Sequence, residues 1–419
     1  MSKLLKSGGL ISIAVLGSGN VVGTVISAIA LIIFSRYLGP TEFGLFSAAF
    51  AAMQIMVRLA DLGVNMAAER AIARSSADTL RADRLIRLAL WLKGLVYLTL
   101  GCFGWFLAPW LSHSLLHFPD VTLLRLSLLL SAGTVFFEYT TLVYQATQRF
   151  GMVARITIAQ ALGKLLFGLL FIWQGVLTAT TAIILYGLMP GIGSLLAWIK
   201  RPLSSLSLPS RWQSDLTQIV QVAKWTGVAA IAATLADNID VLMVQSFLSA
   251  YDTGIWSGAV RIASFASLVG WSIGAVLNIR VARYHNPAHL RAYLQKAWKI
   301  ALFAFIGLLL ATPFAGFAIW ATIGSAYQAA TVPLQILLVA AGLAAATSPY
   351  VALFYLIDRP QYYALAGIIS TLTLLLGDLW FIPQFGLLGA AGVRVVVRFA
   401  VLIFTLIYAK KSLQKHYAV

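Results

Sequence analysis

Charged side chains inside long apolar stretches are the residues of this sequence best able to do chemistry. A charge within a membrane helix is costly, so it usually has a partner or marks the path of a polar substrate or ion. The cations inside predicted spans are Arg58, Lys164, Arg261, Arg394 and Arg398. The anions are Asp61, Glu138, Asp237, Asp240 and Asp378. We therefore treat the five cations as candidate substrate-binding residues and the five anions as candidate ion-coupling residues or charge partners.

The alternative is that these charges only neutralise one another within the helix bundle. Arg58 and Asp61 lie at positions i and i+3 of one predicted helix, where opposite charges can pair. Asp240 and Arg261 lie at similar distances from the outer ends of consecutive predicted helices, hence at similar depth at about 1.5 Å per residue. The spacing therefore predicts two candidate ion pairs.

The remaining cations have less obvious partners. Lys164 lies near the midplane of its predicted helix. Arg394 and Arg398 are one helical turn apart and point the same way, which is unfavourable unless Asp378 or a bound anion lies between them. A diphosphate is an anion that would fit two guanidinium groups so placed.

Other kinds of site are not supported by the sequence. His113 and His117 have the spacing of metal ligands on a helix, but they fall in an interfacial loop without a third ligand nearby, so no metal is expected. The phosphate-binding pattern G-x-x-x-x-G-K-[ST] does not occur, so nucleotide binding through such a loop is not expected. Cys102 is the single cysteine, which excludes an internal disulfide. We expect no cofactor.

The composition indicates an all-α integral membrane protein. Hydrophobic residues make up 60% of the chain and charged residues 10%, whereas charged residues form about a quarter of a soluble globular protein. The apolar runs exceed the roughly 20 residues that a helix needs to cross a bilayer, and barrel strands would alternate over about 10 residues. The first run is too long for a signal peptide, so we interpret it as a membrane helix.

Apolar runs between polar or glycine- and proline-containing breaks predict about twelve membrane helices. The first six are expected near 10–34, 42–66, 88–109, 122–146, 152–174 and 178–199. The second six are expected near 222–248, 254–279, 298–320, 331–356, 361–381 and 388–409. The predicted organisation is an N-terminal lobe (1–199), a cytoplasmic linker (200–217) and a C-terminal lobe (218–419).

An internal repeat relates these two halves. The segment 35–49 reads S-R-Y-L-G-P-T-E-F-G-L-F-S-A-A, and 210 positions later 245–259 reads Q-S-F-L-S-A-Y-D-T-G-I-W-S-G-A. Gly44 thus matches Gly254, and Ser47 matches Ser257. Each half is predicted to contain six membrane helices, an even number, so both halves begin on the same side of the membrane. The two repeats are therefore parallel.

The distribution of lysine and arginine predicts the orientation. Nearly all of them outside the spans fall in loops on the side of the N-terminus, which the positive-inside rule makes cytoplasmic. Both termini are therefore expected in the cytoplasm. The net charge of +17 is explained by this basic rim and its attraction to anionic lipid, and no nucleic-acid partner is expected. The short outer loops leave little room for a soluble catalytic domain, so the chain is not expected to be an enzyme.

Several segments resemble a known family. They are R-Y-L-G-P-T-E-F-G-L-F-S at 36–47, A-D-L-G at 60–63, Q-R-F at 148–150, N-I-D-V-L-M-V at 238–244 and F-G-L-L-G-A-A-G at 385–392. Together they resemble the bacterial oligosaccharide flippases of the multidrug/oligosaccharidyl-lipid/polysaccharide (MOP) exporter superfamily. The resemblance implies two six-helix lobes facing each other in a V, with helices one, two, seven and eight lining a central cavity.

The resemblance also implies an activity. Such proteins flip a polyprenyl-pyrophosphate-linked oligosaccharide from the cytoplasmic to the external leaflet of the bacterial inner membrane by alternating access, for surface or exopolysaccharide synthesis. It places Arg58 and Arg261 where phosphate-binding cations are expected, and a polysaccharide polymerase is an expected partner. The alternatives are a cation-coupled drug antiporter of the same superfamily, for which Asp61, Asp237 and Asp240 would form the sites, and a membrane glycosyltransferase or polymerase.

Overall fold

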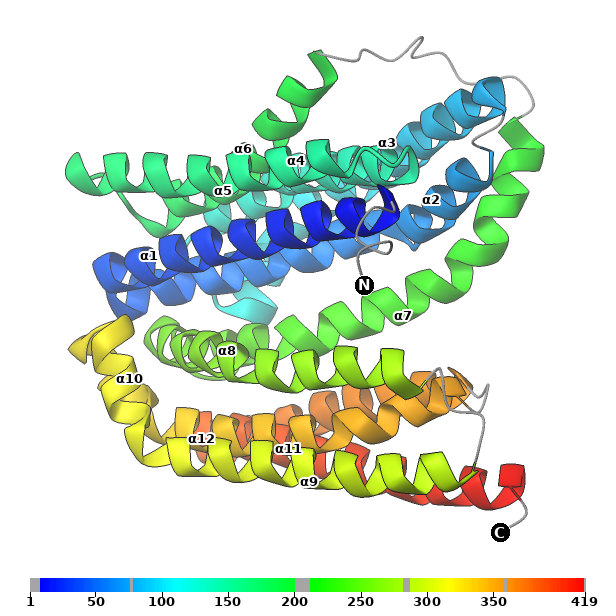
Figure 1. Ribbon diagram of the computed structural model, residues 1–419. Helices are drawn as coiled ribbons and strands as arrows, with labels where there is room; N and C mark the ends of the chain where they lie inside the picture. Colours follow the sequence, from blue (N-terminus) through cyan, green and yellow to red (C-terminus); the bar gives the residue numbers. More distant parts are fainter. Residues whose placement is uncertain (1–7, 76–77, 200–211, 282–286, 357–359, 418–419) are drawn as a thin grey trace. The chain divides into compact units, whose positions relative to one another are not determined.

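The computed structural model describes residues 8–75, 78–199, 212–281, 287–356 and 360–417, and these are almost entirely helical (Figure 1). The helices of the first half are α1 (Gly8–Asp61), α2 (Val64–Arg74), α3 (Thr79–Trp110), α4 (Val121–Ala146), α5 (Phe150–Trp173) and α6 (Ala179–Ile199). Those of the second half are α7 (Trp212–Phe247), α8 (Ala250–Val281), α9 (Pro287–Ala311), α10 (Ala315–Thr322), α11 (Thr331–Leu356) and α12 (Pro360–Tyr417).

Short irregular turns connect some of these helices. A π-helical segment, η1 (Leu111–Leu116), follows α3, and 3₁₀ turns η2 (Thr312–Phe314) and η3 (Ser325–Ala330) flank α10. Asp120 caps α4 by accepting a hydrogen bond from the Thr122 backbone N–H at 2.8 Å, and this bond lowers the pKa of the Asp120 carboxyl. The segments η1 and η3 lie at ends of candidate membrane spans, where water can satisfy backbone groups that the helices leave unpaired, whereas η2 lies within the span Trp298–Thr322.

The two longest helices each contain two membrane crossings. At about 1.5 Å per residue, the 54 residues of α1 are much longer than a hydrocarbon core of roughly 30 Å. The helix is kinked at Gly39, where φ is 70°, and α12 is kinked at Gly386, where φ is 58°. Both kinks fall in the breaks expected at 34–42 and 381–388, and both use a backbone conformation that glycine adopts readily.

Within the described residues, nine helical segments are long and apolar enough to cross a membrane. Two of these, at Gly17–Asp61 and Leu365–Tyr408, are the kinked helices that each hold two crossings. Helix α8, with 32 residues, supplies a further crossing by length. The prediction of an all-α membrane protein with about twelve membrane helices is confirmed.

Two predicted helices differ from the observed ones. The helix expected at 42–66 ends at Asp61, because Leu62 and Gly63 have φ values of 45° and 80°, and α2 then begins in a new direction. The helix expected at 298–320 is divided by the 3₁₀ turn at Thr312–Phe314, which contains Pro313. Proline removes a backbone donor and interrupts a helix at that point.

The chain divides into two compact units. Unit 1 comprises residues up to Leu38 and Leu45–Thr234, and unit 2 comprises Gly39–Gly44 and Leu235–Val419. The first part of α7 therefore belongs to unit 1 and the rest to unit 2. Of the expected linker at 200–217, residues 200–211 lie outside the described residues, and 212–217 form the first turns of α7. The lobes predicted at 1–199 and 218–419 stay a prediction.

The beginning of α7 packs tightly against unit 1. Its Ile219 joins a buried apolar cluster with Ala68 of α2 and Leu85 of α3. A Cβ added at Gly63 would collide with the α7 backbone at Gly227, so the absence of a side chain permits this approach. On the same segment, the carboxylate of Asp215 lies 3.8 Å from Arg81 Nε and 3.7 Å from Arg84 Nε.

In unit 2, α11 packs against α8, α9 and α12. The two copies of the repeated segment also meet within this unit. A Cβ on Gly44 would collide with the carbonyl oxygen of Ala250, and a Cβ on Gly254 would collide with that of Pro40. Pro40 and Ala250 are 210 positions apart, as Gly44 and Gly254 are, so each repeat makes the same contact with the other.

Candidate functional site

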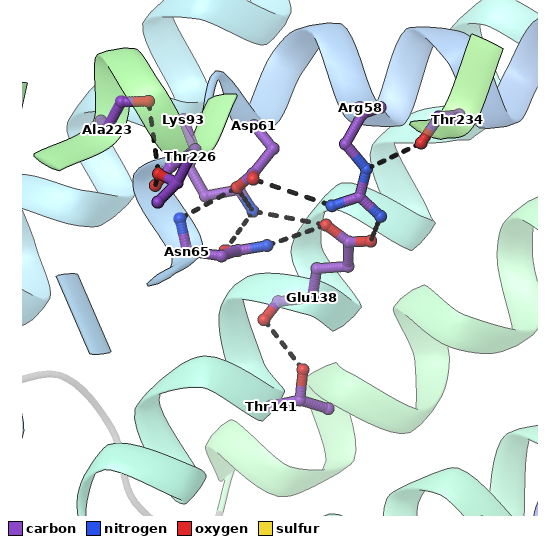
Figure 2. Close-up of polar contacts among 10 residues, drawn as sticks. Arg58, Asp61, Asn65, Lys93, Glu138, Thr141, Ala223, Thr226 and Thr234 are labelled. Carbon is purple, nitrogen blue, oxygen red and sulfur yellow. Dashed lines mark hydrogen bonds and ion pairs between the residues drawn. The ribbon is translucent and has the colours of Figure 1, made fainter. Parts of the chain in front are cut away.

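Four segments of unit 1 bring charged and polar side chains together in the membrane region (Figure 2). Arg58 and Asp61 come from the end of α1, Asn65 from α2, Lys93 from α3 and Glu138 from α4. We call these five residues the unit 1 network. The sharp turn at Leu62 and Gly63 is what brings Asn65 back beside Asp61, and the Asp61 carboxylate accepts a hydrogen bond from the Asn65 backbone N–H at 3.0 Å.

One half of the network is buried. Lys93 Nζ lies 3.3 Å from Asp61 Oδ1, and the two side chains are only 2% and 3% exposed. Lys93 also donates a hydrogen bond of 2.7 Å to the Asn65 side-chain oxygen. A buried ion pair needs such additional hydrogen bonds to offset the loss of hydration. Asp61 and Lys93 are thus held by several short contacts.

The other half is more accessible and more loosely held. Arg58 Nη2 lies 3.4 Å from Glu138 Oε1, and Arg58 Nη1 lies 3.8 Å from Asp61 Oδ2. Arg58 Nε donates to the Thr234 hydroxyl at 3.2 Å. The Arg58 side chain is 31% exposed and that of Glu138 22%. Figure 2 shows Glu138 between Arg58 and Asn65, whose side-chain amide donates to Glu138 Oε2 at 2.9 Å.

The predicted pair of Arg58 and Asp61 is confirmed, and the structure adds Glu138 to it. Sequence reasoning missed Lys93 and Asn65. Lys93 could have been found, because it lies in the apolar run L-A-L-W-L-K-G-L-V inside the helix expected at 88–109. Asn65 carries no charge, and only the turn at Gly63 brings it to the site, so no sequence pattern indicated it.

Lys164 of α5 lies against an aromatic cluster in unit 1. Its Nζ is 4.8 Å from the ring centroid of Tyr186 on α6, an arrangement in which the ring face attracts the cation. Phe34, Phe46 and Phe50 surround the same tyrosine, with ring centroids 5.2 to 6.1 Å away. The lysine is 8% exposed. Apolar and aromatic surroundings of this kind make Lys164 a less accessible ligand for phosphate than Arg58.

Unit 2 contains a second buried charge cluster. Arg394 of α12 donates two hydrogen bonds to Asp240 Oδ2 of α7, from Nη2 at 2.6 Å and from Nε at 3.0 Å. Trp256 of α8 donates to the same oxygen at 3.0 Å. Asp378 is fully buried, and within the described part of the chain neither of its carboxylate oxygens has a hydrogen-bond partner. It is within electrostatic reach of Asp240 and Arg394.

The other predicted residues of unit 2 lie nearer the surface. Asp237 on α7 and Arg398 on α12 are exposed, each about one turn from the Asp240–Arg394 pair. Arg261 on α8 is half-buried, and its backbone carbonyl accepts a hydrogen bond from Ser264. The proposed pair of Arg261 with Asp240 stays a prediction. The anion found beside Arg394 is Asp240, whereas the sequence had suggested Asp378 or a diphosphate.

Comparison with known proteins agrees with this architecture. The chain is 22% identical over 393 residues to a probable low-salt glycan biosynthesis flippase, Agl15, of Haloferax volcanii, covering 91% of this chain and 79% of that protein. Its fold matches the lipid II flippase MurJ in an inward closed conformation, with a TM-score of 0.74, 13% identity, and 94% and 89% of the two chains covered.

A second solved structure shows the same fold. It is an inward-facing multidrug resistance MATE family transporter of the MOP superfamily, with a TM-score of 0.70, 19% identity, and 94% and 96% of the two chains covered. The chain therefore shares the fold of these two transporters. The family model described as "Polysaccharide biosynthesis protein" matches residues 10–278, which is more than half of the sequence. The chain belongs to this polysaccharide biosynthesis protein family.

Proposed function

We propose that the protein is a transporter that flips a polyprenyl-pyrophosphate-linked oligosaccharide across a membrane by alternating access. The observation that carries the proposal is Arg58, a partly exposed arginine on a membrane helix of a polysaccharide biosynthesis protein, with ion-pair contacts of 3.4 and 3.8 Å. The similarity to a probable glycan biosynthesis flippase and the fold shared with a lipid II flippase support the same activity.

The physical chemistry of the substrate requires such cations. A sugar headgroup with a pyrophosphate cannot enter hydrocarbon without losing strong hydration, so the carrier must offer polar and positively charged groups while the polyprenyl tail stays in lipid. Arginine suits this role because its planar group binds phosphate oxygens bidentately. We propose Arg58 and Arg261 as the main pyrophosphate ligands, with Arg398 as an additional exposed cation.

Lys164 and Arg394 are weaker candidates for direct binding than the sequence suggested. Lys164 is engaged by an aromatic ring and Arg394 by Asp240, so either would first have to leave a buried partner. We propose that they, with Asp61, Glu138, Asp237, Asp240 and Asp378, act as charge partners or in ion coupling. The membrane is proposed to be a bacterial inner membrane with both termini in the cytoplasm, where the basic rim contacts anionic lipid. A polysaccharide polymerase would use the exported product.

A cation-coupled antiporter is the second candidate function. The fold is shared with a MATE transporter, and Asp378 offers a buried carboxylate without a hydrogen-bond partner in the described residues. A carboxylate in such surroundings can accept a cation during transport. The partly exposed Arg58 favours the flippase, because a cation in the path of a cationic drug would repel it.

A reconstitution experiment separates the two functions. The purified protein is placed in vesicles that contain undecaprenyl pyrophosphate carrying a short fluorescent oligosaccharide, and an impermeant glycosidase added outside reports which leaflet holds the sugar. The flippase proposal predicts that nearly all of the sugar becomes cleavable, against about half in protein-free vesicles. Uptake of a cationic dye driven by an ion gradient, without movement of the glycolipid, would instead establish the antiporter.

A further inference from the structure

Lys93 contacts both carboxylates of the unit 1 network. Its Nζ lies 3.3 Å from Asp61 Oδ1 and 3.8 Å from Glu138 Oε2, while it also donates to Asn65 at 2.7 Å. The side chain is only 2% exposed, so it is poorly placed to meet a substrate itself. Its contacts are with the residues that hold Arg58.

Asn65 links the two carboxylates in the same way. Its backbone N–H donates to Asp61 at 3.0 Å, its side-chain amide donates to Glu138 at 2.9 Å, and its side-chain oxygen accepts from Lys93. The backbone N–H and both polar groups of the Asn65 side chain are therefore used within the network. Asp61 and Glu138 would each keep short contacts to Lys93 or Asn65 if Arg58 moved away.

Arg58 has a side chain that is 31% exposed, against 3% for Asp61, 2% for Lys93 and 22% for Glu138, and its ion-pair contacts are 3.4 and 3.8 Å long. Removing one partner of a buried ion pair normally leaves an unpaired charge, which is strongly destabilising. Here the departure of Arg58 leaves Asp61 with Lys93 and the Asn65 backbone. The network can thus release Arg58 at a much lower cost than an isolated Arg58–Asp61 pair could.

We propose that Lys93 and Asn65 are positioning residues that satisfy Asp61 and Glu138, so that Arg58 can exchange its carboxylate contacts for a phosphate of the substrate. Glu138 then competes with the phosphate for Arg58 and favours release after transport. This inference rests on the proposed function, since the phosphate is that of the lipid-linked sugar. Lys93 acts through Arg58 and does not contact the substrate.

The test compares Lys93→Met with Lys93→Met/Asp61→Asn in reconstituted vesicles. Without Lys93, Asp61 draws Arg58 inward, so the glycolipid concentration for half-maximal flipping should rise roughly ten- to a hundredfold, the range expected for a lost charge-assisted contact. Removing the Asp61 charge as well should return that concentration toward the wild-type value. Lys93→Arg should resemble the wild type more closely than Lys93→Met, because the charge is kept.

Two outcomes overturn the inference. If the double variant folds but stays as defective as Lys93→Met, then Lys93 binds the substrate directly. If Lys93→Met lowers the melting temperature without changing the half-saturating concentration, its role is only structural. Lys224→Met is the matched control, since Lys224 is exposed on α7, and it should leave flipping unchanged.

Thermal unfolding in detergent tests the inference by a measurement that does not depend on transport. The Lys93–Asp61 pair should show strong coupling in a double-mutant cycle, and the Arg58–Asp61 pair weak coupling. If the wild-type protein moves no glycolipid, the flippase proposal fails, while these two cycles still decide whether Lys93 or Arg58 satisfies Asp61. Stronger coupling for Arg58 than for Lys93 would refute the positioning role.

Discussion

Arg58 and Lys93 carry the same charge in one network, but they differ in what surrounds them. Lys93 is enclosed and contacts three polar groups, whereas the Arg58 side chain is about one-third exposed. Charge alone does not separate a binding residue from a supporting one. The exposure of the side chain does, and it is set by the fold.

Arg58→Ala should weaken transport while the protein still accumulates in the membrane. The lost contact to phosphate is worth about 1.5 to 3 kcal/mol, which corresponds to roughly one to two decades of affinity. Arg58→Lys should restore only part of this, because a lysine cannot bind phosphate bidentately. The half-saturating glycolipid concentration measures the effect. Normal transport by Arg58→Ala would remove Arg58 from the substrate site.

The Asp240–Arg394 pair should behave as a structural pair within unit 2. Asp240 is 1% exposed, so Arg394→Met leaves a buried carboxylate whose remaining hydrogen bonds, among the residues that the structure describes, come from Trp256 and a backbone N–H. The substitution should lower the free energy of unfolding by about 3–5 kcal/mol. Arg394→Met/Asp240→Asn should recover most of that loss. Thermal unfolding in detergent measures both variants. A stable single variant would show that the pair contributes little.

At the scale of elements, the reciprocal contact between the repeats depends on two glycines. Gly44 faces the carbonyl of Ala250, and Gly254 faces that of Pro40. The 210-residue offset shows that the two glycines occupy equivalent positions of the repeat, but the sequence alone does not explain why glycine is needed there. The reason is the close approach of two backbones, which any Cβ would prevent.

Gly254→Ala should therefore destabilise the protein, although alanine favours a helix more than glycine does. Overpacking costs about 1–3 kcal/mol, and here the obstacle is backbone that has little room to move. Gly94→Ala in α3 is the control, because a Cβ there meets nothing within 4 Å and should add about 0.5–1 kcal/mol of stability. Melting temperatures of the two variants should move in opposite directions, and equal shifts would contradict the close contact.

The number and approximate limits of the membrane helices could be predicted because apolar length dominates in a bilayer. The turn at Leu62–Gly63 could not, since Leu62 adopts a left-handed conformation that its residue type does not announce. The charged members of the site, except Lys93, could be predicted from the sequence because a charge inside a membrane helix is energetically costly. Their partners depend on helix rotation and packing, so the ion pair between Asp240 and Arg394 was not among the pairs expected from the sequence.

At the scale of the whole molecule, the orientation in the membrane determines the direction of transport. The prediction that both termini are cytoplasmic comes from loop charge alone. It places the connection between α3 and α4 and the connection between α10 and α11 outside, and the starts of α3 and α7 inside. Exposed residues are available in each of these four places, which allows a direct test.

Single cysteines in a Cys102→Ala background should report this topology. Ser114→Cys and Ser325→Cys, both at exposed positions, should react with an impermeant thiol reagent added to intact cells. Thr79→Cys and Gln213→Cys, also exposed, should react only after the cells are opened. Ser112 is unsuitable because it is buried and donates to the Phe118 carbonyl. The reverse pattern would place the basic rim outside, and the glycolipid would then meet the protein from the opposite leaflet.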